Sequence, residues 1–187
     1  MEHYYSKEQK SPLDLKKISQ RIRGTNFEFC TASGIFSKDR VDKGTLILAE
    51  NMIVNKNNKV LDIGCGIGIL GIAAAKIFNA DVAMTDINKR AVMLAKKNAK
   101  LNNVNAGIFQ GNLYEKTTGN PQTAGKELCF RLIEESKSHL KANGSLQLVA
   151  RHNKGGASLS KKMEQVFGNV KVIAKKSGYS VYMSNNL

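Results

Sequence analysis

The sequence predicts an α/β protein with a Rossmann-like, doubly wound and mostly parallel sheet. From residue 59 onward, short apolar segments of strand length alternate with longer segments of helical period. This alternation is typical of a parallel sheet whose two faces are covered by helices. A glycine-rich stretch over residues 62–68 follows the first of these strands and opens a helix, where a sheet of this kind binds its ligands.

Residues 1–44 are expected to form an appendage of one helix and one hairpin. Ser11, Pro12 and Asp14 stand in the order of a helix cap, a first-turn proline and a capping-box acid. The apolar residues that follow have helical spacing as far as Gly24, namely Leu15, Ile18 and Ile22. Alternation over residues 27–30 then predicts a short strand that returns through residues 35–36.

The cofactor-binding core is expected over residues 45–187, and with the appendage it makes one domain of residues 1–187. Asn88 is the expected cap of the helix that follows the second core strand. The last two strands predict an antiparallel hairpin at one edge of the sheet. Strands are expected at 59–63, 80–86, 106–109, 145–150, 170–174 and 179–183, and helices at 69–78, 88–101, 128–140 and 159–167.

Composition narrows the class of protein. Lys and Arg number 29 against 15 Asp and Glu, a net charge of +14, so a polyanion is the expected partner. The three cysteines are far apart and form no Cys-x-x-Cys pair, so no zinc site is expected. The apolar stretch at 67–75 is too short to span a bilayer and the N-terminus resembles no secretory signal, so we expect a cytoplasmic protein.

The glycine stretch predicts a cofactor loop, and a nearby acid indicates which cofactor. Spacing alone is ambiguous, because residues 66–71 also match the dinucleotide fingerprint and Asp86 follows Gly66 by twenty residues. Asp62 would repel a pyrophosphate but attract the ammonium and sulfonium of S-adenosylmethionine. Asp86 would accept hydrogen bonds from the ribose hydroxyls of either cofactor. We therefore expect S-adenosylmethionine.

Three segments, at residues 62–68, 85–88 and 111–115, resemble the class I S-adenosylmethionine-dependent methyltransferases. The chain is most similar to the small-domain ribosomal RNA guanine-N2 methyltransferases and their single-domain archaeal relatives. The resemblance covers nearly the whole chain and includes residues 34–37 and 41–45. It implies that a set of residues binds the cofactor: Gly64, Gly66 and Gly68 at the methionine moiety, Asp86 at the ribose, Asn112 at the adenine, and Phe36, Ser37, Gly44 and Thr45 in the segment that closes over it.

The resemblance also implies a catalytic role for Asn120 and Pro121. In the family, an Asn-Pro-Pro motif accepts hydrogen bonds from an exocyclic amine and points its lone pair at the methyl carbon, so orientation replaces a strong base. The second proline is absent here, where Gln122 follows Pro121. Residues 115–119 cannot form the apolar strand that precedes this motif in the family. We expect either that the numbering skips residues in this stretch or that another segment of the chain takes the place of this strand in the sheet.

These observations predict a methyltransferase that acts on an exocyclic amine of a nucleobase in RNA, with guanine N2 of ribosomal RNA as the first choice. Glutamine N5 in a translation protein, adenine N6 in DNA, and a catalytically weakened cofactor-binding or RNA-binding module remain as alternatives. His152 follows a predicted strand and is either a base or a phosphate contact. Arg151, Lys154 and the lysine pairs 161–162 and 175–176 could together form one basic stripe.

Overall fold

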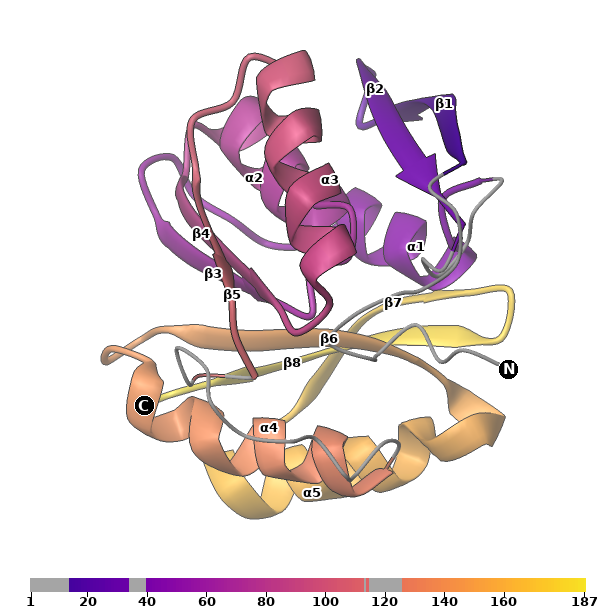
Figure 1. Ribbon diagram of the computed structural model, residues 1–187. Coiled ribbons are helices and arrows are strands. Elements are labelled where there is room, and N and C mark those ends of the chain that lie inside the picture. The colour runs from indigo at the N-terminus through magenta and orange to yellow at the C-terminus, as the bar shows by residue number, and fades with distance from the viewer. Residues whose placement is uncertain (1–13, 34–39, 113, 115–125) are drawn as a thin grey trace. The chain divides into compact units, whose positions relative to one another are not determined.

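The computed structural model describes residues 14–33, 40–112, 114 and 126–187 (Figure 1). These residues belong to two compact units, the first comprising residues 1–49 and 53–120 and the second residues 50–52 and 121–187. The single domain expected over residues 1–187 stays a prediction. No helix in the described part of the chain is long and apolar enough to cross a membrane.

The first unit contains the parallel sheet predicted from the sequence. Strands β3 (Lys59–Ile63), β4 (Asp81–Asp86) and β5 (Gly107–Gln110) pair in the order β3-β4-β5. Helices α2 (Ile69–Phe78) and α3 (Lys89–Leu101) connect them and pack against the sheet (Figure 1). The connection of parallel strands through helices is the βαβ unit of a Rossmann-like fold, so the predicted fold class is confirmed.

Helix α2 lies very close to β4, and two glycines make this approach possible. A Cβ atom on Gly71 would stand 2.5 Å from the Met84 sulfur, and one on Gly68 would stand 3.3 Å from it. Met84 is itself fully buried. Since Gly71 lies in the first turn of α2, this packing fixes the position of the helix N-terminus and of the loop before it.

The N-terminal helix predicted over residues 11–24 is wrong. Residues Leu15–Ile22 form strand β1, which pairs antiparallel with β2 (Thr25–Ala32). The turn between them has positive φ at both Arg23 (46°) and Gly24 (80°), the two-residue geometry whose twist suits a hairpin. The strand at residues 27–30 is confirmed within β2, but it pairs with β1 rather than with residues 35–36, which lie outside the described residues together with residues 11–13.

The β1-β2 hairpin is attached to α3 by two asparagine side chains. The Asn98 side chain accepts from the Cys30 N–H at 2.6 Å and donates to the Cys30 carbonyl at 3.0 Å. One helical turn later, Asn102 makes the same pair of bonds with Glu28, at 3.2 Å and 2.7 Å. Both asparagines are buried, so these bonds form away from competing water.

The second unit is an antiparallel sheet with its helices. Strands β6 (Ser145–Arg151), β7 (Lys171–Lys176) and β8 (Tyr179–Asn185) have the order β6-β8-β7, which confirms the C-terminal hairpin with β7 at an edge. Helices α4 (Lys126–His139) and α5 (Ala157–Phe167) contact each other, and the irregular turn η1 (His152–Gly156), in which Lys154 and Gly155 have non-helical backbone angles, joins β6 to α5. The buried core of this unit comprises Ile133, Met163, Phe167 and Tyr182.

Helix α1 (Lys43–Asn51) begins at a carboxylate cap. The Asp42 side chain accepts from the Thr45 N–H at 3.0 Å, as an N-cap does in the first turn. Residues 115–125, on which the expected irregularity before Asn120 falls, lie outside the described residues.

Candidate active site

The glycine loop is held open by its own backbone and by the neighbouring strand. Gly64, Gly66 and Gly68 all have positive φ, of 68°, 55° and 88°, a region that side chains disfavour. The Gly64 N–H donates to the Thr85 carbonyl at 2.8 Å, which ties the loop to the end of β4. The loop therefore places bare backbone at the carboxyl end of the sheet, where a ligand can approach closely.

Asp86 lies at the last residue of β4 and connects to the same loop. One carboxylate oxygen accepts from the Gly66 N–H at 2.8 Å, and the other accepts from the Asn88 N–H at 2.8 Å. Burial raises the pKa of Asp86, and the hydrogen bonds from Asn88 and Gly66 partly oppose this rise. Each carboxylate oxygen has a further lone pair, so Asp86 can also accept from a pair of ribose hydroxyls.

Asp62 lies near the end of β3, where it is buried and its side chain reaches the first turn of α2. Its Oδ2 accepts from the Gly71 N–H at 2.9 Å. Burial raises the pKa of Asp62 from 3.8 to about 6, the Gly71 bond lowers it, and the charge of Asp86 raises it further. Two carboxylates that disfavour each other's charge would favour a cationic ligand and oppose a pyrophosphate. The structure thus places Asp62 behind the loop, where its charge acts through space.

The third strand brings Asn112 to the same edge. The Gly111 N–H donates to the Asp86 carbonyl at 3.0 Å, and the Gln110 side chain donates to the Ile87 carbonyl at 3.0 Å. These bonds hold the end of β5 against the end of β4. The glycine loop after β3, Asp86 at the end of β4 and Asn112 after β5 consequently lie at the carboxyl ends of three adjacent strands of one sheet.

The remaining predicted site residues are distributed differently. Gly44 and Thr45 lie in the first turn of α1, and the hydrogen bonds of Thr45 go to Asp42. Their role at the cofactor stays a prediction. Four further predicted site residues lie outside the described residues, namely Phe36, Ser37, Asn120 and Pro121.

Two other candidates have a defined environment. Burial raises the pKa of the Cys65 thiol strongly, and the charges of Asp62 and Asp86 raise it further, so this cysteine stays neutral and is unsuited to nucleophilic attack. His152 lies in the second unit, where its Nδ1 is 3.4 Å from the Tyr182 hydroxyl. Within the ranges that the structure describes, no cluster of three His, Cys, Asp or Glu side chains could hold a metal ion.

Asn98 belongs to the site although it was not among the predicted site residues. Its side-chain amide donates to the Ile67 carbonyl in the glycine loop at 2.9 Å, besides its bonds to Cys30. One fully buried side chain therefore connects the loop, α3 and the β1-β2 hairpin. The sequence carries a signal for this role, since Asn98 follows Leu94 by four residues and so lies within the apolar stripe of its helix. A buried amide in such a position needs hydrogen-bond partners.

A parallel sheet with a glycine loop after its first strand and an acid after its second defines a Rossmann-like enzyme that binds a ribose-containing cofactor. Residues 26–183 match the family model of the methyltransferase small domain. The chain belongs to this family and is a class I S-adenosylmethionine-dependent methyltransferase. The predicted enzyme class and the predicted cofactor are thereby confirmed.

The relatives with similar sequences are named for more than one methyl acceptor. The uncharacterized protein YbxB of Bacillus subtilis is 35% identical, with 96% of each chain covered. Ribosomal RNA small subunit methyltransferase C of Pseudoalteromonas atlantica is 30% identical over 87% of this chain, which spans about half (50%) of that relative. "Putative protein N5-glutamine methyltransferase MJ0928" of Methanocaldococcus jannaschii is 31% identical over 70% of this chain and 81% of that protein.

Solved structures show the same fold. The Thermus thermophilus 16S rRNA N2 G1207 methyltransferase, in complex with AdoMet and guanosine, has a TM-score of 0.82 at 21% identity. The match covers 95% of this chain and 52% of that one. A methyltransferase from Pyrococcus furiosus has a TM-score of 0.63 at 21% identity, with 72% and 77% of the two chains covered.

Proposed function

We propose that this methyltransferase transfers a methyl group to an exocyclic amine of a nucleobase in RNA, with N2 of a guanine in ribosomal RNA as the acceptor. The observation that carries the proposal is the arrangement of the glycine loop, Asp86 and Asn112 at one sheet edge in a chain of net charge +14. Such a charge favours a polyanionic substrate. The cytoplasmic location expected from the sequence agrees with ribosomal RNA as the substrate.

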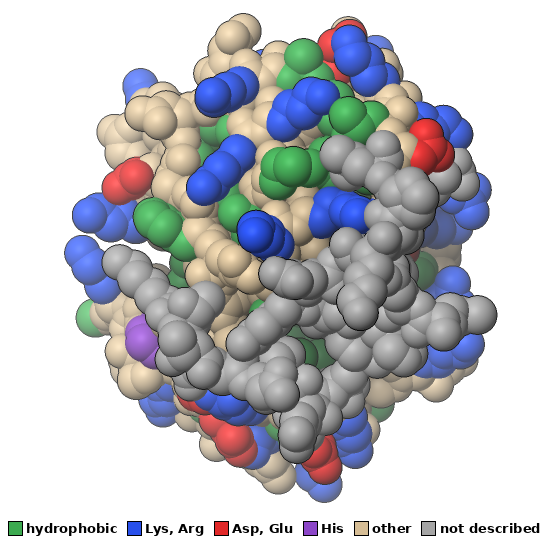
Figure 2. Space-filling view, in the orientation of Figure 1, with side chains coloured by type: hydrophobic (Ala, Val, Ile, Leu, Met, Phe, Trp, Pro, Cys, Tyr) green, Lys and Arg blue, Asp and Glu red, His purple; other side chains and the backbone are tan. Residues whose placement is uncertain are grey.

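Two further observations support an RNA substrate. The T. thermophilus methyltransferase of similar fold is described in complex with guanosine, and curated relatives are named as ribosomal RNA methyltransferases. Figure 2 shows that Lys and Arg side chains outnumber Asp and Glu on the visible face. These features agree with a basic protein whose acceptor base belongs to a phosphodiester chain.

The residues in and around the glycine loop would each contribute differently to cofactor binding. Bound S-adenosylmethionine supplies an activated methyl group on a sulfonium. The bare backbone of Gly64, Gly66 and Gly68 lets the methionine moiety lie close to the sheet, and Asp86 accepts from the ribose hydroxyls. Asp62 stabilises positive charge through space, because its carboxylate is buried beneath the loop.

The acceptor would be oriented by the segment that contains Asn120 and Pro121. The resemblance assigns the Asn120 side-chain oxygen and a neighbouring carbonyl to the amine hydrogens, so that the nitrogen lone pair points at the methyl carbon. Asn120 and the neighbouring carbonyl would hold the amine in line for the new N–C bond, while the methyl group comes from the cofactor, which keeps the electron pair of the S–C bond, and the surplus amine proton would leave to water. Orientation is the main contribution of the protein to this step.

Glutamine N5 is the second candidate acceptor. It rests on the 31% identity to the M. jannaschii relative. A glutamine side-chain amide is, like guanine N2, a planar nitrogen with two hydrogens, so the same acceptor motif would serve. The charge of +14 favours RNA over this alternative, since a glutamine in a protein needs no polycationic enzyme.

The experiment supplies each acceptor class with the same methyl-labelled cofactor. Parallel reactions contain ribosomal subunits, protein-free ribosomal RNA, DNA, and a translation protein with an exposed glutamine. Label in RNA, found as N2-methylguanosine after digestion, supports the proposal. Label in the protein supports glutamine transfer, and label on a ribose oxygen or a base carbon contradicts the proposed chemistry. Tight cofactor binding with no label in any acceptor favours the binding-module alternative.

A further inference from the structure

One end of the second unit's sheet carries a cluster of cations on both of its faces. Strands β6 and β7 are both antiparallel to β8, so their carboxyl ends lie at the same end of the sheet. The His152 N–H donates to the Gly178 carbonyl at 3.0 Å, which ties η1 to the tip of the β7-β8 hairpin. We call this end the hairpin rim; it comprises residues 151–156 and 175–180.

One face of the hairpin rim has an aromatic ring between two cations. Tyr179 is directly opposite Arg151 on β6 and directly opposite Lys176 on β7. Directly opposed residues project from the same face of a sheet. The Arg151 guanidinium carbon lies 5.1 Å from the centre of the Tyr179 ring, within the range of a cation–π contact. The Arg151–Tyr179 pair therefore offers a planar surface on which an unpaired base can stack, with the cation of Lys176 on the same face.

The other face of the rim borders a groove of about 410 Å³ between α5 and the sheet. Its walls include His152, Lys161 and Lys175, and its floor includes Ser180 and Tyr182, each only 2% exposed. Lys161 and Lys175 supply positive charge and Ser180 and Tyr182 supply hydroxyl groups, in a groove that is also lined by the apolar Ala157, Val170 and Val172. Such groups suit the oxygens of a phosphate.

Gly156 packs closely against Tyr182, which lines the groove. A Cβ atom at this position would stand 3.0 Å from the Tyr182 hydroxyl and 2.8 Å from the Arg151 carbonyl oxygen. Glycine thus lets η1 close against β8 and brings His152 to the groove. Over residues 151–187 the sequence has seven Lys and Arg and a single acid, Glu164, which also lines the groove.

We propose that the hairpin rim binds a single-stranded segment of RNA that crosses this end of the sheet, with one base stacked against the Arg151–Tyr179 pair and the adjacent phosphates on Lys176 of the same face and Lys175 of the other. This inference rests on the proposed function in one respect, that the substrate is RNA. Basic side chains alone would suit any polyanion, but an aromatic ring between two cations also matches the alternation of base and phosphate along a single strand. A run of acidic residues in a peptide lacks this regular alternation of an aromatic ring with each negative charge.

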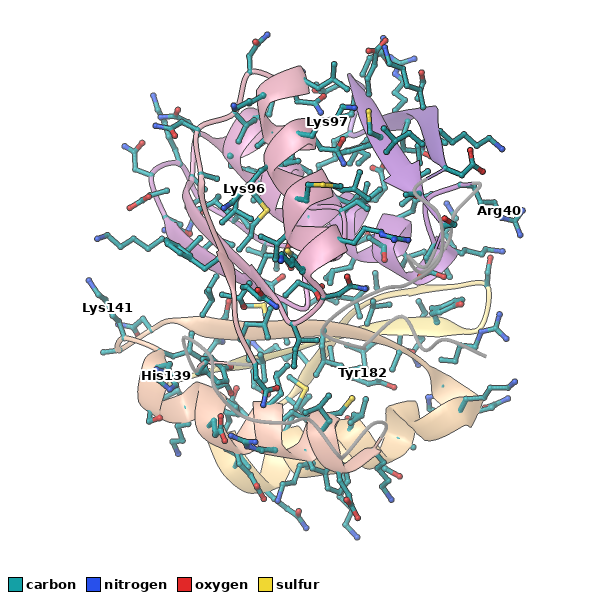
Figure 3. All side chains as sticks on the ribbon, viewed as in Figure 1. Arg40, Lys96, Lys97, His139, Lys141 and Tyr182 are labelled. Atoms are coloured by element: carbon teal, nitrogen blue, oxygen red, sulfur yellow. The ribbon has the colours of Figure 1, made fainter. Side chains whose placement is uncertain are left out.

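The test measures the affinity of an unstructured, fluorescently labelled RNA by anisotropy over a range of salt concentrations. Removing phosphate contacts lowers the slope of log affinity against log salt by about 0.7 for each contact on a single strand. The double variant Lys175→Ala with Lys176→Ala should lower this slope by up to about 1.4. The matched control replaces Lys96 and Lys97 on α3 (Figure 3), which are also exposed and adjacent, and should change it far less.

Two substitutions of Tyr179 distinguish the contribution of stacking from that of charge. Tyr179→Ala should weaken RNA binding by roughly 5- to 150-fold, the range found when a base loses an aromatic partner. Tyr179→Phe keeps the ring and should bind nearly as tightly as the original protein. Cofactor affinity, measured by calorimetry on each variant, should be unchanged, which shows that the first unit is folded, and an unchanged urea unfolding midpoint verifies the whole chain.

Three results would overturn the inference: equal slope changes in the two lysine variants, equal affinity of the alanine and phenylalanine variants at position 179, or no RNA binding even at low salt. Its failure is distinguishable from that of the proposed function. If the rim variants bind RNA as well as the original protein while N2-methylguanosine still forms, only the rim is wrong. If RNA binds through the rim but the label appears in glutamine, only the proposed acceptor is wrong.

Discussion

Replacing Asp62 by Asn should stabilise the protein without cofactor while weakening its cofactor binding. The carboxylate is buried and its pKa is raised from 3.8 to about 6, chiefly by desolvation. Asn has nearly the same shape, and its oxygen can still accept from the Gly71 N–H. The substitution therefore removes the charge and keeps the hydrogen bond.

The size of the effect follows from the pKa. A rise of about two units corresponds to about 3 kcal/mol, at 1.36 kcal/mol per unit, by which ionised Asp62 opposes folding. Because the folded pKa is the higher one, the folded state binds the proton more tightly, and this cost is present above about pH 6. The cost shrinks as the pH falls from about 6 to 3.8, and it is absent below 3.8, where Asp62 is protonated in both the folded and the unfolded state.

Urea unfolding of the two proteins at several pH values checks this reasoning. Without cofactor, Asp62→Asn should have the larger free energy of unfolding at pH 8, by about 1–3 kcal/mol, and this advantage should shrink steadily toward pH 4. Calorimetry at pH 8 should show weaker binding of S-adenosylmethionine, since a negative charge near its cationic groups is lost. A variant less stable than the original protein at pH 8, or one with unchanged cofactor affinity, would refute the argument.

Three other substitutions test the remaining parts of the site. Asp86→Ala should lower cofactor affinity by roughly 5- to 150-fold in calorimetry, because two ribose hydroxyls lose their acceptor; comparable binding of NAD by the original protein would contradict the site. Asn120→Ala should lower kcat far more than cofactor affinity, and equal losses would place it at the cofactor instead. Asn98→Ala should destabilise the fold by at least about 2 kcal/mol and weaken cofactor binding, whereas Asn102→Ala, measured the same way, should affect stability alone.

The core of the first unit was predictable because several local signals agree there. Residues 59–63 have the pattern of a strand and are followed directly by the glycine loop. Asn88 was the expected cap of the helix after the second strand, and its side chain does accept hydrogen bonds from the Arg90 and Ala91 N–H groups. Each signal is short in range and points to the same βαβ arrangement. The positions of the loop and of Asp86 followed from this arrangement, whereas Asn112 came from the resemblance to the methyltransferase family.

The N-terminal segment was not predictable in the same way. Leu15, Ile18 and Ile22 have helical spacing, yet only Ile22 is buried, and Leu15 is 45% exposed. The decisive interaction is the pairing with residues 25–32 across the Arg23-Gly24 turn. Pairing between strands depends on the partner as much as on the segment itself, so a periodic pattern in one of them can mislead.

The asparagine pair on α3 also has a consequence for the protein's solubility during folding. The outer edge of β2 would otherwise present the N–H and carbonyl groups of Glu28 and Cys30 to any extended chain that approaches. Asn98 and Asn102 occupy those groups as the next strand of a sheet would. A helix thus closes a sheet edge through its side chains, and a protein that lost both amides would expose a template for edge-to-edge aggregation.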